Sequence, residues 1–543
     1  MAVNWTREQK QVIEGREKSL LVSAAAGSGK TAVLVERIIQ MITEGENPKD
    51  IDRLLVMTFT RAAAAEMRER IQAAIEKKLE SEPENEHLQQ QAVLVQFAQI
   101  TTIDSFCLHI MREHFDRLDI DPAFRVGDEG EMLLMRADVM DGLLEDYYRD
   151  GGKRYEEFVD AYATGKADGG IAEYVMQVYN FAQSNPWPDA WYEKCREELL
   201  LTEQGELEQT EWMQFLLPDI ELQAQEWKIQ LREAWEICQE TGGPMPYLPM
   251  IEEDLRHAEA VCGAAGSFET ISEALEQFTF SRLAAIRGKN GEVDPEKKAL
   301  VSDCRSRVKK AVEKLKGEYL FASPEQMLTD MEAGKERILE LLELAQEFGR
   351  RFRAKKKEKN VVDFHDLEHF ALEILTEPES ECSEAEETSS AEENDQMQGK
   401  NVWTVRVPGT VADELAVQYD EILVDEYQDS NLVQETLIQC ISGERFDRPN
   451  VFMVGDVKQS IYKFRLARPE LFLEKYSTYT SEESAHQKIE LHQNFRSRDH
   501  ILESINAIFY RIMTEKLGNI SYTEDAALHP GAAFEERDGL DEL

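Results

Sequence analysis

Short apolar runs alternate with amphipathic stretches over the first hundred residues of the chain. Two such runs, at residues 20–22 and 54–57, have the length and composition of buried strands. Between them, apolar residues recur at helical spacing on one face of a helix: Leu34, Ile38 and Met41. A strand, a helix and a strand in this order predict a parallel sheet, and a third strand-like run follows at residues 99–103.

The pattern becomes helical between about residues 130 and 355. Apolar residues there repeat at helical spacing, as Met135 and Val139 do, and few runs resemble strands. Strand-like runs return at residues 421–424 and 451–454. We therefore predict that the sheet resumes after a large helical domain, which is inserted into the first domain.

Length and composition change this picture little. The 543 residues suffice for about three or four domains. No apolar run approaches the ~18 residues that cross a bilayer, and the first residues lack the apolar core of a secretory signal. The seven cysteines are scattered, with no CxxC pair. We expect reduced thiols in a cytoplasmic protein, without a zinc or iron–sulfur site.

The net charge of −46 argues against a protein that coats DNA through a broad basic face, because phosphates are neutralised by lysine and arginine. Screening limits the reach of distant carboxylates to about 8 Å at physiological salt, so a local site can still hold DNA. One stretch, Thr376–Asp395, carries nine carboxylates and no basic residue. This composition predicts a disordered acidic loop, which we place at residues 376–400.

A phosphate-binding sequence follows the first predicted strand and opens the first predicted helix. Small residues let backbone N–H groups surround phosphates at the positive end of a helix. We expect Lys30 to neutralise the β- and γ-phosphates and Thr31 to ligate Mg²⁺. Ala24 stands where the general pattern has its first glycine. The predicted ATP-binding residues are Ala24, Ala25, Ala26, Gly27, Ser28, Gly29, Lys30 and Thr31.

Two carboxylates follow the predicted strand at residues 422–424. Because the carboxyl ends of parallel strands face a bound nucleotide, we expect Asp425 to bind the metal and Glu426 to act as general base. An isolated Asp-Glu pair is common on protein surfaces. The sequence Tyr-Gln-Asp-Ser-Asn that follows at residues 427–431 makes the assignment far more specific.

Taken in order, these motifs resemble those of the UvrD/RecB-like helicases, in particular the bacterial AddAB-type helicase-nucleases. The resemblance covers essentially the whole chain and is strongest outside the helical segment. Eight matches in the order of the family are more specific than any single motif. They are residues 5–9 (WTREQ), 24–31, 58–67 (TFTRAAAAEM), 103–107 (IDSFC), 363–367 (DFHDL), 424–431 (VDEYQDSN), 455–465 (GDVKQSIYKFR) and 494–497 (NFRS).

The resemblance implies further roles at the ATP site. Gln9 would read adenine, since a carboxamide both donates to and accepts from the edge of the base, and Phe495 would stack on it. Arg496 would contact the γ-phosphate, and Gln459 would couple that phosphate to the DNA site. The implied catalytic residues are Glu426, Lys30, Gln459 and Arg496.

For single-stranded DNA the resemblance implies aromatic platforms, where stacking contributes about 1–3 kcal/mol per base. Taken singly, each aromatic residue would more often belong to a core, but its place within a matched motif favours DNA contact. The implied DNA-binding residues are Phe59, Thr60, Arg61, Tyr462, Phe464 and Arg465.

The sequence departs from the family pattern at two positions near these platforms. Arg61 replaces the usual asparagine and can add a phosphate contact, whereas Asp104 replaces the usual histidine and would repel phosphate. A run at residues 350–359 contains seven basic residues. It is either a guide for DNA or an exposed helix end.

The resemblance therefore implies an α/β fold. A P-loop RecA-like parallel-sheet ATPase domain (residues 1–109 and 356–470) would be split by a helical insert (110–355) and followed by the start of a second RecA-like domain (471–543). The implied function is ATP- and Mg²⁺-dependent 3′→5′ helicase activity at DNA double-strand breaks, before recombinational repair, with an AddB-like partner subunit. The exonuclease of the family lies far downstream, and no Asp-Tyr-Lys nuclease signature occurs here. We expect this chain to lack nuclease activity and the rest of the motor.

An alternative of a different class is a regulatory module that binds ATP and DNA without translocating. Such a module would not need Glu426 as a base together with Gln459 and Arg496 as sensors. A P-loop kinase or GTPase has little support, because no Asn-Lys-x-Asp guanine reader occurs.

Overall fold

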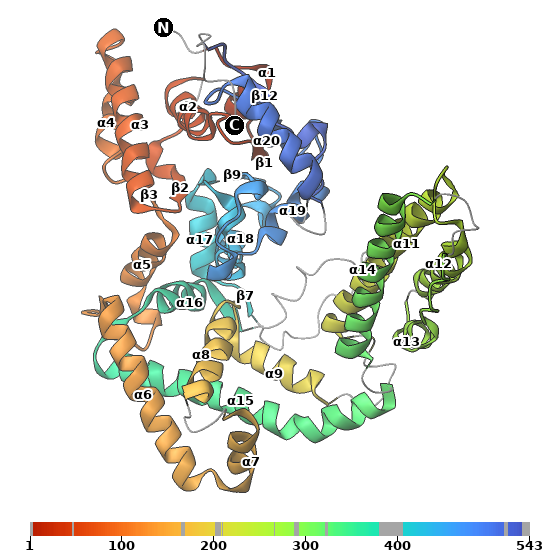
Figure 1. Ribbon diagram of the computed structural model, residues 1–543. Coiled ribbons are helices and arrows are strands. Elements are labelled where there is room, and N and C mark those ends of the chain that lie inside the picture. The colour runs from red at the N-terminus through yellow and green to blue at the C-terminus, as the bar shows by residue number, and fades with distance from the viewer. Residues whose placement is uncertain are drawn as a thin grey trace, which may run out of the picture. The chain divides into compact units, whose positions relative to one another are not determined.

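The computed structural model describes residues 4–45, 48–163, 169–200, 208, 210–264, 266–286, 293–320, 324–378, 406–514 and 520–534. The chain forms two compact units (Figure 1). The first unit comprises Met1–Asp146, Ala172–Trp191 and Ala345–Leu543, and the second comprises Tyr147–Ile171 and Tyr192–Leu344. The polypeptide therefore leaves the first unit and returns to it twice.

A six-stranded sheet lies at the centre of the first unit, in the order β10-β1-β9-β8-β2-β3, and all its pairs are parallel. All residues of β2, β8 and β9 are buried, which explains their continuous apolar sequences. The predicted parallel sheet is thus confirmed, including its resumption after the helical segment. The strands are β1 (Ser19–Ala24), β2 (Leu54–Thr58), β3 (Ile100–Thr102), β8 (Glu421–Val424), β9 (Val451–Gly455) and β10 (His486–Leu491).

The strand β10 occupies one edge of the sheet. Its six residues pair in parallel with β1, with His486 opposite Ser19 and Leu491 opposite Ala24. Buried residues alternate with more exposed ones along β10, as expected for an edge strand. The sheet therefore continues past residue 470, the predicted end of the first RecA-like domain. The division into domains stays a prediction.

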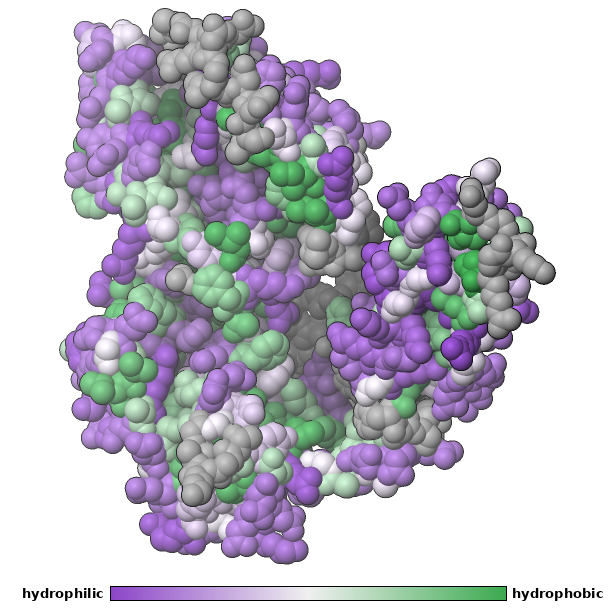
Figure 2. All heavy atoms as spheres, viewed as in Figure 1, coloured by the Kyte–Doolittle hydropathy of each residue, from purple (hydrophilic) through white to green (hydrophobic). Residues whose placement is uncertain are grey.

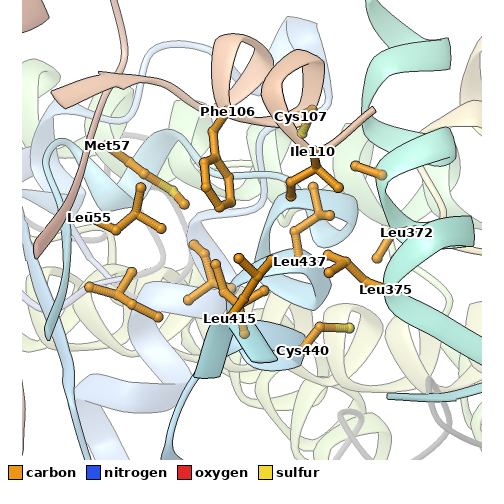
Figure 3. Close-up of a cluster of buried hydrophobic side chains, with 14 of the residues drawn as sticks. Leu55, Met57, Phe106, Cys107, Ile110, Leu372, Leu375, Leu415, Leu437 and Cys440 are labelled. Atoms are coloured by element: carbon orange, nitrogen blue, oxygen red, sulfur yellow. The ribbon is translucent and has the colours of Figure 1, made fainter. Parts of the chain in front are cut away.

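Helices cover both faces of this sheet. Leu55 and Met57 of β2 point into one hydrophobic cluster, while Leu54 and Val56 point into the other, as the pleat of a strand requires. The first cluster, shown in Figure 3, is completed by α5 (Ile103–Glu113), α16 (Phe364–Leu375), α17 (Thr410–Gln418) and α18 (Leu432–Ile441). The second is completed by α1 (Arg7–Glu14), α2 (Lys30–Thr43) and α3 (Arg61–Ser81).

Further short elements and helices complete the first unit. The strand pairs are β4 (Arg125–Val126) with β5 (Val361–Val362), β6 (Thr376–Pro378) with β7 (Arg406–Pro408), and β11 (Gln493–Asn494) with β12 (His529–Pro530). The helices are α4 (Glu86–Leu94), α8 (Gly169–Gln183), α19 (Pro469–Thr478) and α20 (Asp499–Ile512). The first three residues of the predicted acidic loop thus form β6, and its residues 379–400 lie outside the described residues.

The second unit is helical, as the periodicity predicts. Its helix α11 packs against α12 and α14 around buried apolar residues that include Ile220 and Trp227. The buried carboxylate of Asp254 accepts from the Arg305 guanidinium, with 3.1 Å between Oδ1 and Nη2. The helices are α7 (Gly152–Tyr162), α11 (Glu211–Gln239), α12 (Leu248–Gly263), α13 (Phe268–Gln277) and α14 (Pro295–Tyr319). Three further helices include residues of both units: α6 (Glu129–Asp150), α9 (Pro188–Glu198) and α15 (Pro324–Glu358).

The surface fits the high content of charged residues. The face seen in Figure 2 is predominantly hydrophilic, and its hydrophobic side chains lie in small groups. Among the described residues, none of the helices has the length and apolar character needed to cross a bilayer.

A buried cluster of charged residues joins the end of α15 to the start of α16. Lys356 Nζ lies 3.0 Å from Asp363 Oδ2 and 2.6 Å from Asp366 Oδ2, and its side chain is only 4% exposed. Arg136 Nη2 lies 3.6 Å from Asp363 Oδ2, and the ring of Phe352 lies beneath both cations. Burial alone would raise the pKa of Asp363, but the nearby Lys356 ammonium lowers it to about 2. The motif Asp363-Phe364-His365-Asp366 thus has a structural role in this first unit.

Candidate nucleotide site and adjoining aromatic surface

The predicted phosphate-binding loop connects β1 to α2. Gly27 and Gly29 have φ angles of 72° and 84°, in the left-handed region that favours glycine. A Cβ atom on Gly27 would also lie 2.7 Å from Asn494 Nδ2. Lys30 is the first residue of α2, so the loop lies at the positive end of that helix. The same turn contains the other predicted residues, Ala24, Ala25, Ala26, Ser28 and Thr31.

Lys30 faces the carboxylates that follow β8. Its Nζ lies 2.9 Å from Glu426 Oε2. Asp425 accepts the backbone N–H of Glu426 at 3.0 Å. Burial, and then the charge of Glu426, raise the pKa of Asp425 to about 6, and the same two causes raise the pKa of Asp429 to about 6. Three carboxylates close to one lysine favour a further cation.

The side chains near this loop fit a divalent metal ion bound together with a nucleotide. A metal ion in such sites takes one or two protein ligands and completes its coordination with phosphate and water. Asp425 and the Thr31 hydroxyl are suitable ligands. The buried Ser28 Oγ has no hydrogen-bond partner among the described residues, which fits a donor that awaits a phosphate oxygen. Groups of three or more candidate metal ligands do not occur in the described part of the chain.

The backbone of Glu426 is strained. Its φ of 53° and ψ of 43° place it in the left-handed region, which costs a residue with a side chain about 1–3 kcal/mol. The contact with Lys30 and a hydrogen bond of 2.9 Å from Gln428 Nε2 hold its carboxylate in place. Such strain is typical of a residue whose orientation matters for chemistry. Sequence analysis did not identify Gln428, because its role depends on contacts between loops.

A cavity of about 220 Å³ lies between the N-terminal helix and the segment after β10. It brings Gln9 and Phe495 together, as predicted for the adenine site. The Gln9 amide donates to Ser28 O at 3.0 Å and accepts Thr6 N–H at 2.9 Å. Phe495 N–H donates to Gly27 O at 2.9 Å, which ties this segment to the phosphate-binding loop. The cavity is lined by Thr6, Glu8, Gln9, Ser28, Leu491, His492, Gln493, Phe495 and His529.

The two predicted sensors lie on different segments. Gln459 Nε2 donates to Asp456 Oδ2 at 2.8 Å, just after β9. Arg496 directly follows Phe495, and its backbone N–H donates to Asn494 Oδ1 at 2.8 Å. Among the described residues, no contact joins the Arg496 guanidinium to Lys30 or to the other predicted catalytic side chains. The roles of Gln459 and Arg496 stay predictions.

Three aromatic residues form a surface at the ends of β2 and β9. The ring centroids of Phe59 and Tyr462 are 4.7 Å apart, and those of Tyr462 and Phe464 are 5.9 Å apart. Phe59 is 40% exposed and Phe464 is 76% exposed, so both offer a ring face to a ligand. We call these three residues the aromatic surface.

The polar residues predicted to bind DNA lie at the start of α3 and after β9. Thr60 caps α3, accepting Ala63 N–H at 3.1 Å, and Arg61 is the first residue of that helix. Burial raises the pKa of Asp104, and the charge of Arg61 opposes this shift, so the two departures from the family pattern lie near each other. The side chain of Arg465 lies outside the described part of the structure.

Residues 5–480 match the model of the UvrD/REP helicase N-terminal domain. The chain belongs to the UvrD/REP helicase family. The match includes the helical second unit, so the insert is part of this UvrD/REP helicase domain.

The chain is also similar to three curated UvrD/REP-type proteins, each named as the A subunit of an ATP-dependent helicase/nuclease. It is 45% identical to the one from Lachnoclostridium phytofermentans over 537 residues, which are 98% of this chain and 37% of that protein. It is 42% identical to the one from Clostridium beijerinckii over 533 residues, 98% and 41% of the two chains. It is 40% identical to the one from Bacillus velezensis over 538 residues, 98% and 41%. The chain spans about two fifths of the length of these relatives.

The basic run at residues 350–359 lies at the end of α15 in this UvrD/REP helicase chain. Most of its cations have carboxylate partners within the first unit. Arg351 Nη1 lies 2.8 Å from Asp146 Oδ2, Lys357 pairs with Asp119, and Lys356 belongs to the buried charged cluster. These ion pairs favour the interpretation as a helix end over the interpretation as a guide for DNA.

The aromatic surface predicts how this UvrD/REP helicase domain binds single strands. Replacing Phe464 with alanine should weaken binding to an oligo-dT strand by about 1–3 kcal/mol, because a stacking contact is lost. The dependence of affinity on salt should hardly change, since no phosphate contact is removed. Fluorescence anisotropy at several salt concentrations measures both quantities. Ile461→Ala is a matched control, because Ile461 is 70% exposed nearby but has no ring; an equal loss in both variants would contradict a stacking role.

Proposed function

We propose that the chain is the ATP-binding part of an AddA-like DNA helicase, which hydrolyses ATP to move 3′→5′ along single-stranded DNA. One observation carries this proposal: the phosphate-binding loop, the carboxylates and the aromatic surface all follow strands of one parallel sheet. They come after β1, β8, and β2 with β9, respectively, and so lie along the same edge. ATP and DNA would therefore bind side by side on one rigid element.

The geometry suggests how the residues share the chemistry. The loop amides and Lys30 would hold the phosphates, Asp425 and Thr31 would hold Mg²⁺, and Glu426 would accept a proton from the attacking water. The bound metal would neutralise charge that develops on the phosphates. Lys30 now pairs with Glu426, and a phosphate on Lys30 would compete for this pairing. Nucleotide binding would thus release the Glu426 carboxylate for catalysis.

The biological setting follows from the relatives. Their name describes one subunit of a helicase/nuclease, so we propose a role in processing DNA double-strand breaks for recombinational repair, in the cytoplasm and with an AddB-like partner subunit. We also propose that the first RecA-like domain extends through β10 and that the second begins after Leu491. Nuclease activity is proposed only for the full-length relatives.

The alternative is a regulatory module that binds ATP and DNA without moving. The contacts of Glu426 argue against it. A strained carboxylate, held by Lys30 and Gln428 beside the phosphate-binding loop, is an arrangement for hydrolysis rather than for passive binding.

The test is ATP hydrolysis by the purified protein with and without oligo-dT. We expect the DNA to stimulate hydrolysis, and Lys30→Ala to abolish the stimulated activity. A fluorescent duplex with either a 3′ or a 5′ single-stranded tail reports the direction of movement. Tight binding of both ligands without DNA-stimulated hydrolysis would favour the regulatory module.

A further inference from the structure

Gln428 connects the loop after β8 with the loop after β9. Its side-chain amide nitrogen donates to Glu426 Oε2 at 2.9 Å and to Asp429 Oδ2 at 3.1 Å. Its amide oxygen accepts the backbone N–H of Asp456 at 3.0 Å. A backbone N–H can only donate, so Asp456 fixes the orientation of the amide. The amide nitrogen must therefore face the carboxylates.

The two loops are built closely around this side chain. Gln428 is 1% exposed, so its amide depends on protein partners rather than on solvent. A Cβ atom on Gly455, the last residue of β9, would lie 2.3 Å from Gln428 Oε1. Glycine at this position thus leaves the space that the amide occupies. The side chain and the facing strand end are matched in shape as well as in hydrogen bonding.

Beyond Asp456 the contacts continue to the aromatic surface. The Asp456 carboxylate accepts Gln459 Nε2 at 2.8 Å. Three residues further along the same segment, the ring of Tyr462 contacts that of Phe59. A connected series of contacts and short backbone links therefore runs from the Glu426 carboxylate, through Gln428, to the side chains that we propose stack on DNA.

We propose that Gln428 is a positioning residue that couples the binding of single-stranded DNA at the aromatic surface to the position of the Glu426 carboxylate. This inference rests on the proposed function. Stacking of DNA on Tyr462 and Phe464 would shift the segment that begins at Asp456. Because one end of the buried amide is held by Asp456 and the other holds Glu426, a shift of one loop moves the other.

Two replacements separate the parts of this connection. Gln428→Ala removes the link entirely. Gln428→Glu keeps the length of the side chain and an oxygen for the Asp456 N–H, but its ionised carboxylate cannot donate to Glu426 and repels it. Both variants should break the coupling. Gln434→Ala is the matched control, because Gln434 lies on α18 and its amide also donates to a carboxylate, Glu368 Oε1 at 2.7 Å.

The experiment measures coupling as a ratio of two affinities. The dissociation constant of a fluorescent, non-hydrolysable ATP analogue with Mg²⁺ is determined without and with saturating oligo-dT. We expect DNA to change this constant at least about fivefold in the unaltered protein and in Gln434→Ala. In the two Gln428 variants the change should fall below about twofold, while the affinity for each ligand alone stays within about threefold. A purely structural role would weaken both affinities and leave their coupling intact.

The possible outcomes are distinguishable. Gln428 variants that keep the full ratio would overturn the proposal, and so would a ratio of one in an unaltered protein that binds both ligands. Failure of the unaltered protein to bind the nucleotide or the DNA would contradict the proposed function instead. Thermal unfolding shows whether each variant is folded, and either of the two Gln428 variants suffices for the test.

Discussion

Replacing Glu426 with glutamine should lower the rate of ATP hydrolysis by about 10²- to 10⁴-fold, the usual contribution of a general base. Glutamine is close to glutamate in shape but cannot accept the proton of the attacking water. Nucleotide affinity should change little, because Glu426 pairs with Lys30 rather than holding the phosphates. Release of phosphate under saturating DNA, and binding of a fluorescent ATP analogue, measure the two quantities separately.

Lys30→Ala provides the opposite result and serves as the comparison. It should weaken nucleotide binding, since a phosphate would lose its positive partner at the start of α2. Hydrolysis at the unaltered rate by Glu426→Gln would show that another group accepts the proton. Asp429, which lies in the turn that follows Glu426, would then be the next residue to replace.

Replacing Lys356 with methionine should destabilise the first unit by about 3–5 kcal/mol, as is typical when one partner of a buried ion pair is removed. The change leaves Asp363 and Asp366 buried without their shared cation. The loss should shrink as the pH falls towards 4, because the two carboxylates can then be protonated. Urea denaturation at about pH 7.5 and about pH 4.5 measures the difference.

Lys357→Met is the matched control for this prediction. Lys357 follows Lys356 in α15 and also pairs with an aspartate, but its side chain is 55% exposed and that of Asp119 is 95% exposed. Exposed pairs contribute about 0–1 kcal/mol, so this variant should be nearly as stable as the unaltered protein. Equal destabilisation by both replacements would mean that burial of the Lys356 cluster is not what stabilises the fold.

The strands that sequence analysis found are those buried on both faces. The runs at 54–57, 421–424 and 451–454 are continuous and apolar because helices cover both sides of β2, β8 and β9. β10 was not predicted, since its sequence HQKIEL alternates weakly and carries polar residues towards solvent. An edge strand of this kind is defined by its partner, which here lies more than 400 residues earlier in the chain.

The same distinction applies to the candidate site. The phosphate-binding loop and the pair Asp425-Glu426 are local in sequence, so their spacing alone predicts their chemistry. The pairing of Lys30 with Glu426 and the place of Gln9 beside Phe495 were expected only from the resemblance. The link made by Gln428, and the burial of Lys356 within a run that otherwise reads as a solvated helix end, depend on tertiary contacts. No spacing rule contains that information.

The order of strands in the sheet has a consequence for synthesis on the ribosome. β1 is among the first segments made, but its two neighbours, β9 and β10, begin only at Val451 and His486. At about 5–20 residues per second, this apolar strand waits on the order of 20 to 90 s with both edges unpaired. Such edges pair readily with other chains. We therefore expect the nascent polypeptide to depend on chaperones during this interval, and the ATP site to form late although its signature sequence emerges early.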